Sequence, residues 1–113
     1  MDFQFNTLKE NTITVLETNN KIDRPYSFNN SILKFGREEY NQNDIQVSGS
    51  NTVSRRHCII INTKDNVWLY DLESTGTELN YEIVTNKIPL IGHNKIKIKD
   101  IHFTITTDKT KLL

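Results

Sequence analysis

Residues 53–58 read VSRRHC and bring four chemically active side-chain types together in one short stretch. A serine or cysteine beside a histidine is the pair that a hydrolase uses. Adjacent arginines suit a phosphate or a nucleic acid, whereas a cysteine with a histidine suits a metal ion. The directions of these side chains, and the other loops that lie beside them, decide which chemistry applies.

Neither catalysis nor metal binding suits this cluster. Cys58 follows His57 directly and opens an apolar strand, so the two side chains should point to opposite faces. We interpret Cys58 as a small buried hydrophobe, and nothing in the sequence identifies an oxyanion hole for Ser54. The three histidines are scattered, without CxxC or HxxxH spacing. We therefore expect no enzyme activity, no metal site and no cofactor.

The composition of the chain limits the classes of partner. The 113 residues suit one domain, and 14 basic against 14 acidic side chains give no net charge that would steer nucleic acid or an anionic membrane. The single cysteine excludes an intrachain disulfide, and the N-terminal residues do not read as a signal peptide. We therefore expect a cytoplasmic domain that binds neither nucleic acid nor membrane.

Apolar residues alternate with a period of two, which predicts short β-strands and no helix of three turns. Candidate strands are residues 12–17, 26–28, 31–35, 43–47, 58–62, 67–72, 77–80, 95–99 and 101–106. Residues 58–62 and 67–72 read as a hairpin, and Trp68 within it as a half-buried or core side chain. Residues 81–87 read as a turn region, and the alternating lysines of residues 95–99 as protection of an edge strand. This pattern predicts an all-β sandwich.

Two further loops contain the same kinds of phosphate-binding groups as residues 53–58. Gly36 and Arg37 end a strand, and residues 73–77, ESTGT, place hydroxyl groups around Gly76. A phosphorylated side chain carries about −1.5 to −2 charge and three acceptor oxygens, which guanidinium, hydroxyl and backbone N–H groups meet well. Because each loop lies at a strand end, a sandwich could gather all three at one rim.

Together these residues resemble the forkhead-associated (FHA) domain family. The matching pattern runs Gly36-Arg37, Ser54-x-x-His57, Asp71-Leu72-x-Ser74, Thr75-Gly76-Thr77 and Asn80, and the resemblance covers about residues 12–105. It implies a sandwich of ten to eleven mostly antiparallel short strands over residues 12–106, with the binding loops at one end. Residues 1–11 would be an extension or first strand, and residues 107–113 a tail.

The resemblance implies a role for eight residues. Those that would contact a phosphothreonine peptide are Arg37, Ser54, Arg55 and Thr75. Those that would shape or support the loops are Gly36, His57, Gly76 and Asn80. Arg56 would point away as a solvated side chain. The implied partner is a threonine-phosphorylated protein or peptide of a kinase pathway, and the implied function is a signalling or adaptor module.

The chain departs from the family at one position, because the asparagine that normally precedes Gly76 is missing. That asparagine bonds the peptide backbone, and losing such a hydrogen bond costs about 0.5–1.5 kcal/mol. The alternative is therefore a phospho-independent interaction or assembly domain of the same fold. Taken alone, Arg37 could instead pair with Glu38 or Glu39, and Ser54 could cap a turn.

Overall fold

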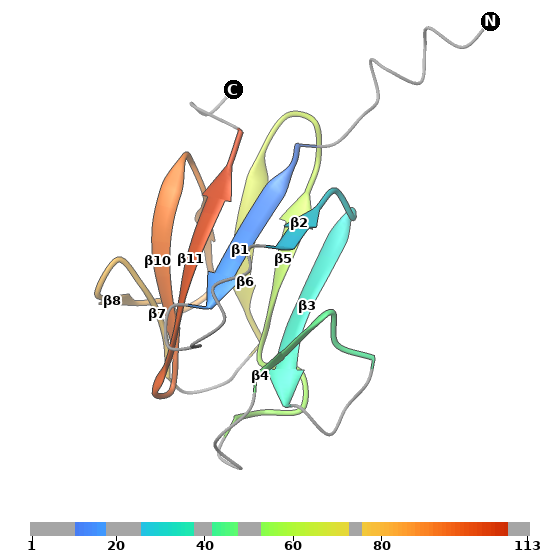
Figure 1. Ribbon diagram of the computed structural model, residues 1–113. Coiled ribbons are helices and arrows are strands. Elements are labelled where there is room, and N and C mark those ends of the chain that lie inside the picture. Colours follow the sequence, from blue (N-terminus) through green and yellow to red (C-terminus); the bar gives the residue numbers. More distant parts are fainter. Residues whose placement is uncertain (1–10, 18–25, 38–41, 48–52, 73–75, 109–113) are drawn as a thin grey trace, which may run out of the picture.

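The computed structural model describes residues 11–17, 26–37, 42–47, 53–72 and 76–108. All the regular elements in these ranges are β-strands (Figure 1). They are β1 (Ile13–Glu17), β2 (Tyr26–Phe28), β3 (Ile32–Arg37), β4 (Ile45–Val47), β5 (Cys58–Asn62), β6 (Val67–Asp71), β7 (Thr77–Leu79), β8 (Glu82–Ile83), β9 (Lys87–Pro89), β10 (His93–Ile98) and β11 (Ile101–Thr107). Within the described ranges, no helix is long and apolar enough to cross a bilayer.

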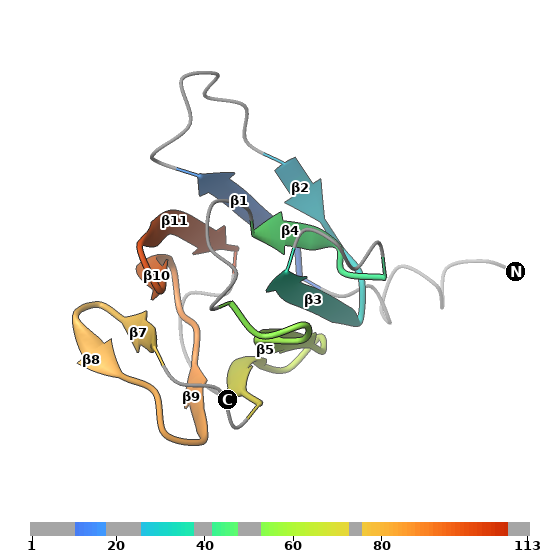
Figure 2. The ribbon, with the colours of Figure 1, turned by 90° about the horizontal axis from the view of Figure 1, so that it is seen from below.

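The strands form two sheets. The six-stranded sheet has the order β2-β1-β11-β10-β7-β8, and the five-stranded sheet has the order β4-β3-β5-β6-β9. Strands β3 and β4 pair in parallel, and the other pairs are antiparallel. Seen from below, β10 and β11 lie on one side and β3 and β5 on the other (Figure 2). The predicted all-β sandwich is confirmed.

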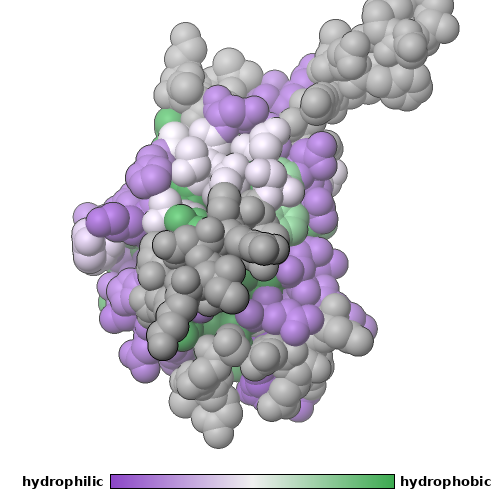
Figure 3. Space-filling model, viewed as in Figure 1, coloured by the Kyte–Doolittle hydropathy of each residue, from purple (hydrophilic) through white to green (hydrophobic). Residues whose placement is uncertain are grey.

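The core lies between the sheets and follows from the alternation of the strands. Ile13 and Val15 of β1 are buried, as are Ile96 and Ile98 of β10. Phe35 of β3 meets Phe103 of β11 edge to face, with ring centroids 5.8 Å apart, so this pair joins the two sheets. Burying each such side chain contributes about 1.5–3 kcal/mol. Hydrophilic side chains predominate on the described surface seen in Figure 3, as expected when the apolar faces point inward.

The predicted hairpin is confirmed, and part of the predicted turn region is corrected. Strands β5 and β6 pair antiparallel, with Ile60 opposite Leu69, and Trp68 is half-buried. The region predicted as a turn holds β8 and the first residue of β9. These short strands form because β7 and β6 offer them backbone partners, which local sequence does not reveal. Strand β11 extends through Thr107.

The lysines of residues 95–99 do not protect an edge, so that prediction is wrong. Strand β10 lies between β11 and β7, whereas β2 and β8 are the edges of this sheet. The lysines alternate because the strand has one buried face, with Ile96 and Ile98 in the core. Lys95 and Lys97 therefore lie on the outer face of the six-stranded sheet.

Candidate functional site

Arg37 ends β3 and is tied to the loop that precedes β5. Its backbone amide donates to the Ser54 carbonyl at 3.0 Å, and its Nε donates to the Val53 carbonyl at 3.0 Å. A guanidinium held through Nε still has its two terminal nitrogens as donors for a ligand. The structure thus brings Arg37 and Ser54, two of the predicted contact residues, next to each other.

Gly36 permits this close approach of strand and loop. A Cβ atom at this position would overlap the Arg55 carbonyl oxygen and would lie 2.5 Å from Nδ2 of Asn43. Any side chain would therefore push the loop away from β3. The requirement for glycine here is steric, because the backbone of a second segment occupies the space of a side chain.

Asn43 is a supporting residue that the sequence analysis missed. Its buried Nδ2 donates to the carbonyl oxygens of Arg55 at 2.7 Å and Arg37 at 3.4 Å. Its Oδ1 accepts from Nε of Arg56 at 2.9 Å. One amide therefore links the end of β3 to the loop of residues 53–57. The only signal in the sequence is a polar residue just before a short strand, which is common in loops.

Arg56 does not point away into solvent, so that prediction is wrong. Its side chain is half-buried, and its guanidinium donates to Asn43. Arg56 turns inward because buried Asn43 has an acceptor oxygen that must be satisfied. Arg56 acts as a support beneath the loop, while its neighbour Arg55 has an exposed side chain.

Ser54 and Arg55 lie at the exposed side of the same loop. Ser54 is half-buried, and its amide and carbonyl are both used, by His57 and Arg37 respectively. No hydrogen bond joins its hydroxyl to another residue that the structure describes, so the turn-capping alternative is not observed. Glu38 and Glu39, the alternative partners of Arg37, lie outside the described residues. The backbone bond between Arg37 and Ser54 places these two residues and Arg55 at the same end of β3.

His57 is buried and supports the loop from below. Its Nδ1 accepts from the Ser54 amide at 3.2 Å, so the proton of the neutral ring is on Nε2. Burial lowers the pKa of His57, although Asp71 acts in the opposite direction; Lys99 lowers it further. The Nε2 atom has no hydrogen-bond partner among the described residues. The ring is therefore neutral and structural.

The third predicted loop is closed at its base. Oγ1 of buried Thr77 donates to Oδ1 of Asp71 at 3.0 Å, and the Lys99 amide donates to the Gly76 carbonyl at 3.0 Å. The first bond joins the residues on either side of the loop, and the second joins Gly76 to the turn between β10 and β11. Thr75, the predicted contact residue, lies outside the described residues.

Asn80 shapes a different turn, between β7 and β8. Its Oδ1 accepts from the Lys95 amide at 2.9 Å, and its Nδ2 donates to Oδ1 of Asn94 at 3.1 Å. It also has a left-handed backbone conformation, with φ of 50°. Asn80 therefore fastens the β7–β8 hairpin to β10.

Neither a reactive cysteine nor a metal site is found among the described residues. Cys58 is fully buried, and burial raises the pKa of its thiol, so it is a poor nucleophile. In the described part of the chain, no three His, Cys, Asp or Glu residues are arranged to hold a metal ion. The arrangement that remains is a loop cluster of donors suited to a phosphate group.

Comparison with known protein families shows to which family the chain belongs. The model of the FHA domain matches residues 33–100, which is more than half of the chain. The chain belongs to the FHA domain family. FHA domains are non-catalytic modules that bind phosphothreonine, and the matched region contains the loops that hold Arg37, Ser54 and Arg55.

Solved FHA structures share the fold. EmbR of Mycobacterium tuberculosis, in complex with a low-affinity phosphopeptide, is 26% identical with a TM-score of 0.76 over 88% of this chain, which covers 25% of that protein. The N-terminal FHA domain of S. cerevisiae Rad53p, in complex with a phosphothreonine peptide, is 21% identical (TM-score 0.71; 86% of this chain, 94% of that one). The FHA domain of CT664 from Chlamydia trachomatis is also 21% identical (TM-score 0.69; 86% and 96%). No curated protein sequence matches the chain.

Proposed function

We propose that this FHA domain binds threonine-phosphorylated peptides of a partner protein and works as an adaptor in a kinase pathway. The observation that carries the proposal is the link between Arg37 and Ser54, whose backbones are joined at 3.0 Å beside the exposed Arg55. This link holds together two segments of the chain that carry one hydroxyl and two guanidinium groups between them.

The electrostatics of these residues support phosphate as the ligand. Phosphothreonine carries about −1.5 to −2 charge, and arginine forms short, often bidentate, hydrogen bonds to its oxygens. The chain as a whole has no net charge, so attraction to an anion must come from such a local group of donors. Arg37, held through Nε, and the hydroxyl of Ser54 are our candidates for the phosphate contacts, with Arg55 as an added cation and Thr75 lining the pocket.

The setting and strength of binding also belong to this proposal. A buried, free Cys58 is compatible with the reducing cytoplasm, where kinases and their substrates meet. The missing asparagine before Gly76 removes one hydrogen bond to the peptide, so we expect affinity up to about tenfold below that of a complete site.

Fluorescence anisotropy with a degenerate phosphothreonine peptide library tests the proposal. We expect micromolar binding that is lost in the unphosphorylated library and weakened in the phosphoserine library. Arg37→Ala, Ser54→Ala and Arg55→Ala should each weaken binding by about tenfold or more without unfolding the domain. Lys64→Ala, at an exposed turn between β5 and β6, is the matched control and should bind as the unmodified domain does. Equal binding of the phosphorylated and unphosphorylated libraries would overturn the proposal.

A phospho-independent interaction domain is the second candidate. The shortened loop before Gly76 favours it, because a site that lacks one peptide contact is easier to lose. This candidate predicts binding that survives removal of the phosphate and is impaired by substitutions on a sheet face. The same peptide libraries therefore separate the two functions.

A further inference from the structure

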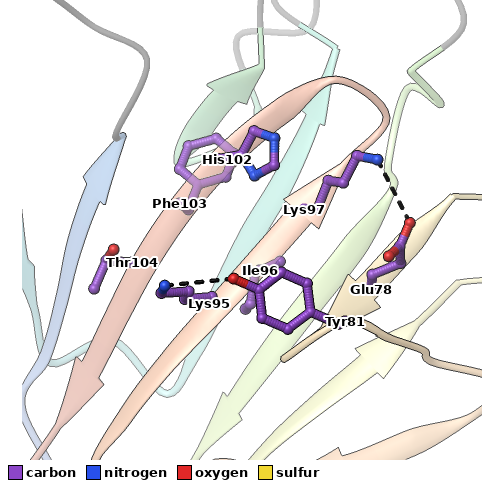
Figure 4. A pocket seen from close by; sticks show the side chains of 8 residues that line it. All are labelled: Glu78, Tyr81, Lys95, Ile96, Lys97, His102, Phe103 and Thr104. Atoms are coloured by element: carbon purple, nitrogen blue, oxygen red, sulfur yellow. Dashed lines mark hydrogen bonds and ion pairs between the residues drawn. The ribbon is translucent and has the colours of Figure 1, made fainter.

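A surface depression lies on the outer face of the six-stranded sheet, away from the loops at the end of β3. This depression of about 270 Å³ opens over β7, β10 and β11 (Figure 4). Its polar walls come from Glu78, Tyr81, Lys95, Lys97, His102 and Thr104. None of these residues belongs to the predicted phosphopeptide contacts.

The ionisable side chains of this depression favour an anionic partner. Lys97 lies opposite Glu78 on β7, and their charged groups are 3.7 Å apart. Lys95 lies opposite Thr104 on β11, so its cross-strand neighbour supplies no carboxylate. Two ammonium groups, those of Lys95 and Lys97, therefore face a single carboxylate among the lining residues. The surplus positive charge suits acidic side chains.

The backbone of Tyr81 gives a second, independent observation. Asn80 and Tyr81 have φ of 50° and 74°, a pair of left-handed residues for which hairpin turns strongly prefer Asn-Gly. Tyrosine is unfavourable in this position, and its side chain is 80% exposed, so it adds little to the core. Strained residues of this kind cluster at functional sites. The ring is therefore a candidate for contact with a partner.

The surroundings of Tyr81 show what such a partner would carry. The Tyr81 hydroxyl lies 3.5 Å from Nζ of Lys95, and the ammonium is 5.9 Å from the ring centroid (Figure 4). Ile83, on the same hairpin, is 73% exposed. The β7–β8 hairpin thus supplies an aromatic ring and an aliphatic side chain, and β10 supplies a cation, which is the composition of an interface centre with a charged rim.

We propose that this face binds an acidic, unphosphorylated segment of a partner protein. Carboxylates of the segment would face Lys95 and Lys97, and an apolar side chain would pack against Tyr81 and Ile83. The carboxylate of Glu78, at one side of the depression, opposes a dense row of phosphates such as a nucleic acid backbone. The surface does not depend on the proposed phosphothreonine site, so one chain could engage two segments and gain avidity.

Titration of the isotopically labelled protein with twelve-residue peptides tests this inference. One peptide alternates Asp and Glu with Leu and Phe, and matched versions replace either its acidic residues or its apolar residues by Ser. We expect amide shifts that centre on Tyr81, Lys95 and His102 for the first peptide, and at least tenfold weaker binding for both versions. Tyr81→Gly and Lys95→Glu should each weaken binding tenfold or more.

The controls separate this surface from folding and from the phosphate loops. Glycine accepts the left-handed conformation at position 81, so Tyr81→Gly should remain folded and any loss of binding reports on the ring. Lys64→Glu reverses an exposed charge elsewhere, and Arg55→Ala changes the phosphate loop; both should bind the acidic peptide normally. Absent shifts, shifts centred on residues 53–57, or equal binding of an oligonucleotide or of phosphatidylserine vesicles would each overturn the proposal.

Discussion

The backbone amide of Arg37 donates a 3.0 Å hydrogen bond to the carbonyl of Ser54. This bond joins the end of β3 to a loop that begins more than ten residues later in the chain. The two side chains that we propose as phosphate contacts therefore come from segments that this backbone bond helps to hold together. The residues that keep this contact in place should matter for binding as much as the ligand contacts themselves.

Asn43→Ala should lower both stability and phosphopeptide affinity. The substitution removes the side chain that bonds the Arg55 carbonyl and the Arg56 guanidinium in a part-buried setting, which costs about 1–3 kcal/mol. Urea unfolding and peptide anisotropy measure the two effects. Gln42→Ala, an exposed position next in the chain, should change neither; equal behaviour of the two variants would contradict the role of Asn43.

Gly36→Ala should be among the more damaging conservative substitutions. The added methyl group overlaps the backbone of Arg55, so the loop must move, at a cost of about 1–3 kcal/mol. Peptide binding should fall with stability, because Ser54 and Arg55 move with the loop. Gln46→Ala is the control, because Gln46 of β4 is the residue that pairs with Gly36 of β3. Wild-type stability and binding of Gly36→Ala would rule out the close approach.

Stability should fall as the pH is lowered through the ordinary pKa of histidine. Burial lowers the pKa of His57 in the folded state from 6.5, so below that pH the unfolded chain binds its proton more readily. The contribution of His57 to stability is complete above about pH 7, and it decreases as the pH falls below 6.5, by at most about 1.4 kcal/mol per pH unit. Urea unfolding at pH 7.5 and 5.5 measures the loss.

The other histidines provide the control for this pH dependence. His93→Asn and His102→Asn should still lose stability between pH 7.5 and 5.5, since both side chains are exposed. His57→Gln should be less stable throughout but should lose the dependence between pH 7.5 and 5.5. A dependence that persists in His57→Gln would assign the effect to another group.

Cys58 should resist alkylation in the folded domain. Its side chain is fully buried, and the raised pKa of the thiol leaves little thiolate to react. Reaction with iodoacetamide at pH 8 should be at least about 10³-fold slower than in urea, because it requires unfolding. Mass spectrometry follows the reaction, and rapid modification without denaturant would show that the β5 end opens locally.

Tyr81→Gly should leave stability unchanged or raise it by up to about 1 kcal/mol. The left-handed backbone at position 81 costs energy for tyrosine and little for glycine, while the extra freedom of glycine in the unfolded chain offsets part of the gain. Tyr70→Gly, on the half-buried face of β6, should instead destabilise the domain. A large destabilisation by Tyr81→Gly would show that the ring supports the fold.

The sequence alone determined the all-β architecture and its family. Alternation is a local property, so Ile13 and Val15 could be assigned to the core from their spacing. The pattern at Gly36-Arg37 and Ser54-x-x-His57 was enough to predict a phosphate-binding loop cluster, because the residue types and their order are specific. Cys58 could be read as buried from its place at the start of an apolar strand.

Only the tertiary structure decided which residues, distant in the sequence, contact one another. Asn43 and Arg56 looked like ordinary loop residues until the fold placed them beneath Arg55, in contact across 13 residues of sequence. The alternation predicted Lys95 and Lys97 on an edge strand, whereas the structure places them on the outer face of a central strand. The order of the strands depends on long-range pairing, which alternation does not encode. The strain at Tyr81 likewise arises only when the β7–β8 hairpin is fastened to β10 through Asn80, since a turn conformation is imposed by the strands that it joins.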